Sequence, residues 1–244
     1  MFRTITSILA VLTLVAVYNN GVLAADDGHE HHDHDTQKSM KHTASADSGI
    51  YTLLVDPLGD SLVNVAKPVA RVHEGRQLLF ASEKNVATFK KNPDKYLAGV
   101  DALIIKQQDP LYPLTTCVVS DDKLDMAGTP IQRVIGNRLV KFCCPGCIGN
   151  FKKDPAQYLS KIDAAVIASQ KENYPLATCV VSGEKLGGDM GKPLQYVAGT
   201  QLVKFCCKGC VKAFEKNPAK YLSQLEAKPT KNPETSKNHQ GHNH

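Results

Sequence analysis

The sequence contains no tryptophan, and aromatic residues make up only 6% of its 244 positions. A chain with so few large side chains is better suited to several small cores than to one extended core. It also has no block of basic residues, because its 29 basic and 24 acidic side chains are interleaved. We therefore expect small modules, and we do not expect nucleic acid as a partner.

Signatures of common enzyme classes are also missing. No Ser/His/Asp set, no pair of catalytic carboxylates and no glycine-rich phosphate loop stands out in the sequence. We therefore expect no enzymatic activity.

Long apolar runs are scarce, and the one from Ile8 to Val17 is shorter than the about 20 residues that cross a bilayer. This run follows a basic residue and precedes Val22-Leu23-Ala24, as in a secretory signal with a small residue at the cleavage site. We expect residues 1–24 to be removed as a signal peptide. Cysteine is absent before Cys117, so no lipid anchor is expected at the cut. The mature protein is expected to be exported, periplasmic or secreted, and not held by a membrane.

Histidine is concentrated in two polar tails, residues 25–49 and 228–244. Both tails have few apolar side chains, so we expect them to be disordered. The run His31-His32-Asp33-His34 combines imidazole and carboxylate groups, which suit a flexible, low-affinity store of Zn(II), Cu(II) or Ni(II). The auxiliary metal ligands would be His29, His31, His32, His34, His239, His242 and His244. The alternative is that the tails only keep the protein soluble.

Two segments of the chain are near copies of each other. YPLTTCVVS at 112–120 returns as YPLATCVVS at 174–182, and LVKFCCPGC at 139–147 returns as LVKFCCKGC at 202–210. The offset is 62 at the first cysteine and 63 at the later ones, so one residue is inserted between them. A repeat of this length indicates tandem structural modules.

A third copy precedes these two and lacks cysteine. Its aromatic and proline frame is kept at Tyr51, Phe80, Phe89, Pro93 and Tyr96. Asp56 stands near the place of Cys117, while Ala81, Ser82 and Asn85 stand where the second copy has Cys143, Cys144 and Cys147. We thus expect modules at 50–108, 109–171 and 172–227, the first being a degenerate spacer or docking unit. A copy that folds without thiols argues that the thiols serve binding.

Each module is expected to be a small α+β unit in which an antiparallel β-hairpin is followed by two helices. In the second copy, residues 115–120 and 131–135 look like strands, and Gly136-Asn137 is a hairpin turn before a strand at 138–142. A short helix should open at the cysteines, and Asp154-Pro155 is a typical helix start. Burial alone stabilises a unit of about 55 residues only marginally, so a metal or a disulfide would help.

Eight cysteines in an exported protein would ordinarily indicate disulfides, but their spacing favours a metal site. Cys143 and Cys147 are four residues apart and would share one helix face, where Cys117 from the preceding strand can complete a trigonal set. Cys144 is a candidate fourth ligand. Thiolates are favoured at a helix N-terminus, and they select Cu(I) and Zn(II) over hard ions. The candidate ligands for one Zn(II) or Cu(I) per module are Cys117, Cys143, Cys144 and Cys147, and Cys179, Cys206, Cys207 and Cys210.

These modules resemble the YHS and TRASH domains, small cysteine modules of heavy-metal trafficking, resistance and sensing proteins. The resemblance rests on Cys117, Phe142-Cys143-Cys144-x-x-Cys147, Phe151, Asp154-Pro155 and Tyr158, and on their counterparts in the third module. It implies that Cys144 and Cys207 are auxiliary, because this position is often serine in relatives. It also implies a role in metal trafficking, storage or resistance, with a metal-transport or metal-delivery protein as a partner.

The chain departs from the family at Ser120 and Ser182, where family zinc sites with four cysteines carry a second cysteine shortly after the first. A closed four-thiolate site would therefore need Cys144 or an outside ligand. An open or three-coordinate site would suit a metal that is handed on.

Two other functions compete with metal trafficking. Cys144-Pro-Gly-Cys147 and Cys207-Lys-Gly-Cys210 are Cys-x-x-Cys motifs between a strand and a helix, as in thiol-disulfide redox proteins. The short repeat and the additional Cys117 and Cys179 count against this alternative. Disulfides or zinc could also merely stabilise a protein-interaction scaffold. Metal binding is the first hypothesis.

Overall fold

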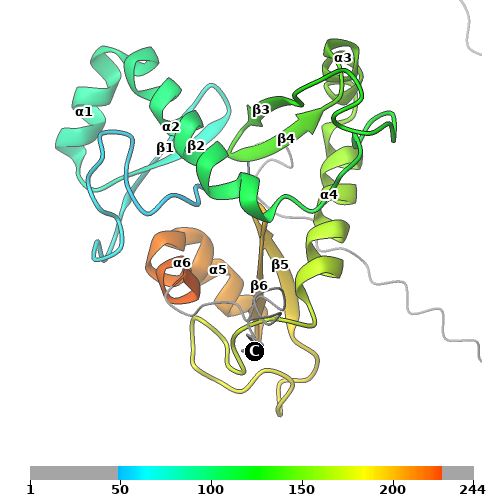
Figure 1. Cartoon of the computed structure of the whole chain (residues 1–244). Helices are drawn as coiled ribbons and strands as arrows, with labels where there is room; N and C mark the ends of the chain where they lie inside the picture. The colour runs from blue at the N-terminus through cyan, green and yellow to red at the C-terminus, as the bar shows by residue number, and fades with distance from the viewer. Residues whose placement is uncertain (1–48, 227–244) are drawn as a thin grey trace, which may run out of the picture. The chain divides into compact units, whose positions relative to one another are not determined.

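The computed structural model describes residues 49–226 (Figure 1). The expected signal peptide, nearly all of the first histidine-rich segment and all of the C-terminal segment 228–244 lie outside these residues, together with the seven histidines named as auxiliary ligands. Across 49–226, no helix is both long enough and apolar enough to cross a bilayer.

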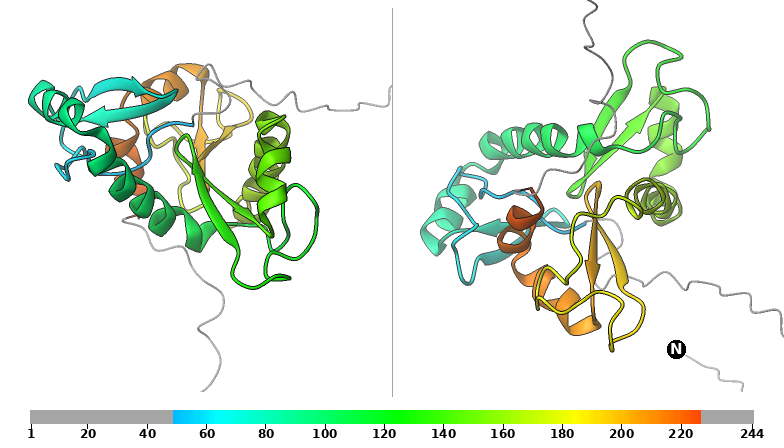
Figure 2. Two further views of the ribbon diagram at one scale, coloured as in Figure 1. Left: turned by 90° about the horizontal axis from the view of Figure 1, so that it is seen from above. Right: turned by 60° about the horizontal axis from the view of Figure 1, so that its bottom comes forward.

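The described chain is α+β and repeats one unit, a two-stranded antiparallel hairpin followed by two helices (Figures 1 and 2). The first unit contains β1 (Val69–His73), β2 (Arg76–Phe80), α1 (Glu83–Lys91) and α2 (Pro93–Gln108). The second contains the 3-10 turn η1 (Asp109–Leu111), β3 (Ile131–Ile135), β4 (Arg138–Phe142), α3 (Pro145–Phe151) and α4 (Pro155–Gln170). The third contains β5 (Leu194–Ala198), β6 (Gln201–Phe205), α5 (Lys208–Lys216) and α6 (Pro218–Glu226). The expected fold class is confirmed.

The three hairpins share one register. Val69 pairs with Phe80, Ile131 with Phe142, and Leu194 with Phe205 at the open end of each hairpin. In the second hairpin the turn is made by Gly136, whose φ of 60° lies in the left-handed region that glycine enters without a steric penalty. Both strands of this hairpin are therefore as predicted. The residue that follows the phenylalanine occupies the same place in every module, at Ala81, Cys143 or Cys206.

The expected strand at 115–120 is wrong. Only Thr116 forms an isolated bridge, to Lys123, after which the chain turns back on itself. The backbone N–H of Cys117 donates to the carbonyl of Asp122 at 2.7 Å, and Asp121 N–H donates to the carbonyl of Cys117 at 2.9 Å. Threonine and valine favour strands, but no neighbouring strand pairs with this segment, so the local turn prevails.

The helix starts confirm one expectation and contradict another, that Cys143 and Cys147 share a helix face. Asp154 caps α4 by accepting from Gln157 N–H at 3.2 Å, with Pro155 in the first turn, as the sequence predicts. By contrast, α3 begins at Pro145 with an extended Cys144 as its N-cap, so Cys143 lies before the helix. Cys143 and Cys147 therefore do not share a helix face. Their sulfur atoms meet because the link between β4 and α3 folds Cys143 towards the first helical turn.

Aromatic side chains fill the module cores, as expected. Phe142 and Phe151 meet edge to face at 5.5 Å between ring centroids, and Phe151 stacks on Tyr158 at 5.6 Å. Corresponding contacts join Phe80, Phe89 and Tyr96 in the first module. The cysteine-free copy therefore keeps the same packing.

The cores are also shared between modules. Val197 and Leu202 of the third module pack into the core of the second. Ile50 packs into the core of the third module, and Ala219 of α6 packs into the core of the first. Each module thus completes its hydrophobic core with residues from another.

Two glutamines hold successive modules together. Gln108, at the end of α2, donates to the carbonyl of Asn137 at 2.9 Å and accepts from Leu139 N–H at 2.8 Å. Gln170, at the end of α4, repeats both bonds with Thr200 and Leu202, each at 2.8 Å. Each helix end therefore binds the turn of the next hairpin by the same pair of hydrogen bonds.

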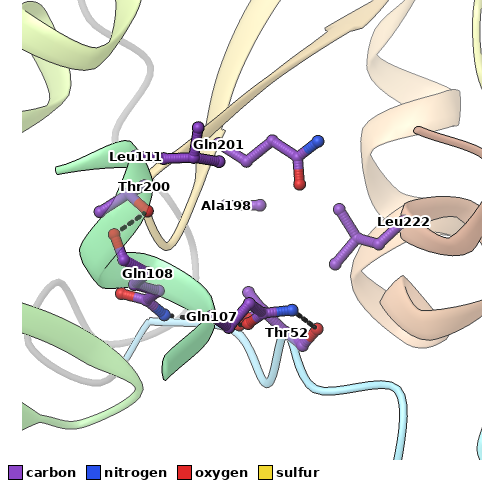
Figure 3. A pocket seen from close by; sticks show the side chains of 8 residues that line it. All are labelled: Thr52, Gln107, Gln108, Leu111, Ala198, Thr200, Gln201 and Leu222. Carbon is purple, nitrogen blue, oxygen red and sulfur yellow. Dashed lines mark hydrogen bonds between the residues drawn. The ribbon is translucent and has the colours of Figure 1, made fainter. Parts of the chain in front are cut away.

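A pocket of about 10 Å³ lies beside this junction (Figure 3). In Figure 3, the hydroxyl of Thr200 donates to the backbone carbonyl of Gln108 at 2.9 Å, and Gln107 is bonded to Thr52. Such a volume holds about one water molecule. It is too small for an organic ligand.

Candidate metal centre

Two cysteine triads form in the structure, one in the second module and one in the third. The sulfur atoms of Cys117, Cys143 and Cys147 all lie within 4.8 Å of one another, and the same holds for Cys179, Cys206 and Cys210. All six side chains are buried. In each module the three sulfurs come from the turn before the hairpin, the strand–helix link and the first turn of the helix.

The fourth cysteine of each module lies at the edge of its triad. The Sγ atoms of Cys144 and Cys147 are 3.6 Å apart, and those of Cys207 and Cys210 are 3.7 Å apart. Cys144 and Cys207 are half-buried, whereas the other six cysteines are buried. The structure therefore brings all eight candidate cysteines into two groups of four. Whether they bind a metal stays a prediction.

A serine side chain lies beside each triad, and this contact was not predicted from the sequence. Ser120 Oγ lies 3.4 Å from Cys143 Sγ, and Ser182 Oγ lies 3.3 Å from Cys206 Sγ. These are the positions where the sequence departs from the four-cysteine pattern of the YHS and TRASH families. A hydroxyl thus borders the sulfur group at this position, and its recurrence in both copies was the available signal.

The sulfurs of one triad have different pKa values, because their surroundings differ. Burial raises the pKa of Cys117, but hydrogen bonds from the backbone N–H groups of Cys143 and Ser120 outweigh it and lower the pKa to about 7. Equivalent bonds, chiefly from Ser182 and Cys206, lower the pKa of Cys179 to about 7. Burial raises the pKa of Cys147 to about 12. One sulfur of each triad is therefore close to ionisation at neutral pH.

The remaining shifts follow the same logic. Burial raises the pKa of Cys210 to about 12, as for its counterpart Cys147. A backbone N–H bond from Cys147 lowers the pKa of Cys144, and one from Cys210 lowers that of Cys207. The buried sulfurs at the helix thus favour the neutral thiol unless a cation offsets their charge.

The sulfur spacing fits a soft metal ion. Cys143 and Cys147 are 3.8 Å apart at Sγ, and Cys206 and Cys210 are 3.7 Å apart. Two thiolates bound tetrahedrally to one ion at about 2.3 Å are separated by about 3.8 Å. A disulfide would need about 2.05 Å, and all eight cysteines are free thiols. The triads are thus compatible with metal binding or with thiol redox chemistry.

The first module fills the same place with hydrogen bonds. Asp56 Oδ2 accepts from Ala81 N–H at 3.2 Å and from Asn85 Nδ2 at 2.6 Å. Its Oδ1 accepts from the backbone N–H groups of Leu58 and Asp60 at 2.9 and 3.0 Å. Ser82 occupies the N-cap position of α1, as Cys144 and Cys207 do in α3 and α5, but only the Ser82 side chain accepts a hydrogen bond from its helix. We call this set, Asp56, Ala81, Ser82 and Asn85, the polar plug.

Comparisons with protein-family models, with curated proteins and with solved structures found no match to this chain. The resemblance to YHS and TRASH domains stays a prediction from the residues named for it, as does the expected export.

Proposed function

We propose that this protein is an exported heavy-metal-binding protein of the YHS/TRASH type, which holds one Cu(I) or Zn(II) ion in each of its two cysteine modules. One observation carries the proposal. Three buried sulfurs from three separate segments converge within 4.8 Å in both modules. Soft thiolates select these two ions over Mg(II) or Ca(II).

A purely structural role, in which the sulfurs only stabilise the fold, explains the triads less well. The first module has the same hairpin register and the same aromatic contacts with no sulfur at all. The fold of a module therefore does not require thiols, which supports a role for them in binding.

The half-buried fourth cysteine of each site favours transfer of the metal ion to another protein over permanent storage. Three sulfurs are buried, while Cys144 and Cys207 are half-buried at the edge. A partner that delivers or receives the ion could reach this fourth sulfur first. The role is then trafficking or resistance, with a metal-delivery protein as partner and without catalysis.

Metal analysis of the anaerobically purified protein tests the proposal. The wild type, reconstituted with Zn(II) or Cu(I) under reducing conditions, should hold one ion per cysteine module. Cys143→Ser combined with Cys206→Ser should hold none and should keep its circular dichroism spectrum. As a matched control, Cys144→Ser combined with Cys207→Ser should keep both ions, because each triad stays complete. A wild type that binds neither ion, or a triad variant that still binds both, would overturn the proposal.

Thiol-disulfide exchange is the second candidate, favoured by the 3.6 Å separation of the Cys144 and Cys147 sulfurs. An insulin-reduction assay separates the two functions. Turnover at the rate of a dedicated oxidoreductase would promote the redox function, and its absence together with bound metal would support the proposed one.

A further inference from the structure

Each cysteine module contains a pair of thiols of unequal exposure. Cys144 is half-buried and Cys147 is buried, with their sulfurs 3.6 Å apart. Cys207 and Cys210 repeat this arrangement at 3.7 Å. The backbone keeps the first pair in register, because Cys147 N–H donates to the carbonyl of Cys144 at 3.3 Å. An accessible thiol thus lies next to a member of the triad.

Glycine keeps the position next to the half-buried sulfur free of a side chain. A Cβ added at Gly146 would lie 3.9 Å from Cys144 Sγ, and one added at Gly209 would lie 3.7 Å from Cys207 Sγ. Lys84 takes the glycine position in the first module, where the two cysteines are replaced by Ser82 and Asn85. Glycine therefore accompanies the cysteine pair, at the position where a side chain would contact the half-buried sulfur.

We propose that Cys144–Cys147 and Cys207–Cys210 are sites of reversible disulfide formation, and that each disulfide releases the metal of its module by withdrawing one ligand from the triad. The second half of this inference rests on the proposed function. The first half, formation of the disulfide, does not.

The reaction is a two-step exchange with an external disulfide. The thiolate of Cys144 attacks one sulfur of that disulfide, forms a mixed disulfide and expels one thiolate. The sulfur of Cys147 then attacks Cys144 Sγ, the Cys144–Cys147 bond forms, and the second thiolate leaves. Two electrons pass from the cysteine pair to the external disulfide, and the two thiol protons end on the expelled thiols. An oxidising exported compartment would supply such disulfides.

Geometry selects this pair over the other sulfurs. Cys143 and Cys147 are both buried, so neither offers an accessible sulfur for the first step. The Cys144–Cys147 separation must shrink by about 1.5 Å to reach the length of a disulfide bond, which is within the range of side-chain rotation. Once Cys147 is oxidised, only two sulfurs of the triad remain to hold an ion.

Disulfide mapping tests the first half of the inference. The full chain, reduced and freed of metal, is treated anaerobically with oxidised glutathione, digested and mapped by mass spectrometry. We expect Cys144–Cys147 and Cys207–Cys210 disulfides, each with the loss of two hydrogens. Pairing that involves Cys117 or Cys143, or glutathione adducts that persist on Cys144, would overturn it.

The matched variant is Cys144→Ser combined with Cys207→Ser, which should form neither disulfide. Serine already caps the equivalent helix at Ser82, so this change preserves the helix start. Circular dichroism checks the fold.

Release of Zn(II) to a fluorescent indicator tests the second half. Oxidised glutathione should release one Zn(II) per cysteine module from the loaded wild type and should release at least tenfold less from the serine variant. Disulfides that form while Zn(II) stays bound would overturn the release step alone. A starting protein that takes up no Zn(II) or Cu(I) would overturn the proposed function and leave the mapping result standing.

Discussion

The first module and the two cysteine modules share a fold and differ in how its interior site is filled. All three have the same hairpin register and the same helix-capping position. The first closes the site with the polar plug, in which the Asp56 carboxylate accepts four N–H donors. The other two place three buried thiols there. Site and scaffold are thus separable in this chain.

The two fillings differ in their energetics. A carboxylate that accepts several N–H bonds is well satisfied, and its bonds stabilise the turn that carries it. Thiols are weak donors and acceptors, so the triads gain little from one another. The polar plug is therefore satisfied by hydrogen bonds within the first module, whereas the sulfur atoms of the triads can still bind a cation.

The largest expected effect follows from transplanting the triad. Asp56→Cys, Ala81→Cys and Asn85→Cys together should give the first module a site of its own, because these residues occupy the places of Cys117, Cys143 and Cys147. Metal analysis should then show one ion more than the wild type holds. Asp56→Cys and Asn85→Cys alone, with two sulfurs, serve as the control and should add none. A folded triple variant with no additional ion would show that the modules differ in more than their side chains.

A smaller effect is expected from breaking the polar plug. Asp56→Ala leaves buried N–H donors without an acceptor and should lower the free energy of unfolding by about 2–4 kcal/mol. Cys117→Ala in the metal-free protein should cost about 1 kcal/mol, because it removes a small, weakly bonded side chain. Urea unfolding of both variants measures the contrast. Equal losses would contradict the energetic distinction between the two fillings.

The smallest expected effect concerns pH. The pKa of Cys117 is lowered to about 7 in the fold, so its contribution to stability is full above the ordinary pKa of about 9 and is lost as the pH falls towards 7. The pKa of Cys147 is raised to about 12, so its contribution is full below about 9 and is lost as the pH rises towards 12.

Ultraviolet absorbance of thiolate in the metal-free protein measures this titration. A step near pH 7 should weaken in Cys117→Ser combined with Cys179→Ser. The same step, unchanged in this variant, would count against the assignment of the acidic sulfur. The first module, which lacks thiols, contributes nothing to the signal.

Local signals made much of this fold predictable. Gly136-Asn137 and Asp154-Pro155 each determine a turn or a helix start from a few adjacent residues, and both predictions are confirmed. The alignment of Asp56, Ala81 and Asn85 with the cysteine positions agrees with the structure, in which these three residues lie together, although their hydrogen bonds were not predicted. The strand predicted at 115–120 was wrong because strand propensity has no effect without a pairing partner.

Contacts between modules could not be inferred from local patterns. Gln108 resembles any polar residue at a helix end, yet it is 2% exposed and binds the next hairpin. Its burial depends on where Asn137 and Leu139 lie, which the sequence around it does not encode. The recurrence of glutamine at Gln170, one repeat later, was the available clue.

The shared cores have a consequence for how the two sites depend on each other. Unfolding of the third module would remove Val197 and Leu202 from the core of the second, so neither module can open without damage to its neighbour. A ligand that binds only the folded state stabilises everything that unfolds with it. An ion in one module should therefore protect the other from proteases even while that second site is empty, and a fragment containing one repeat would lose this mutual protection.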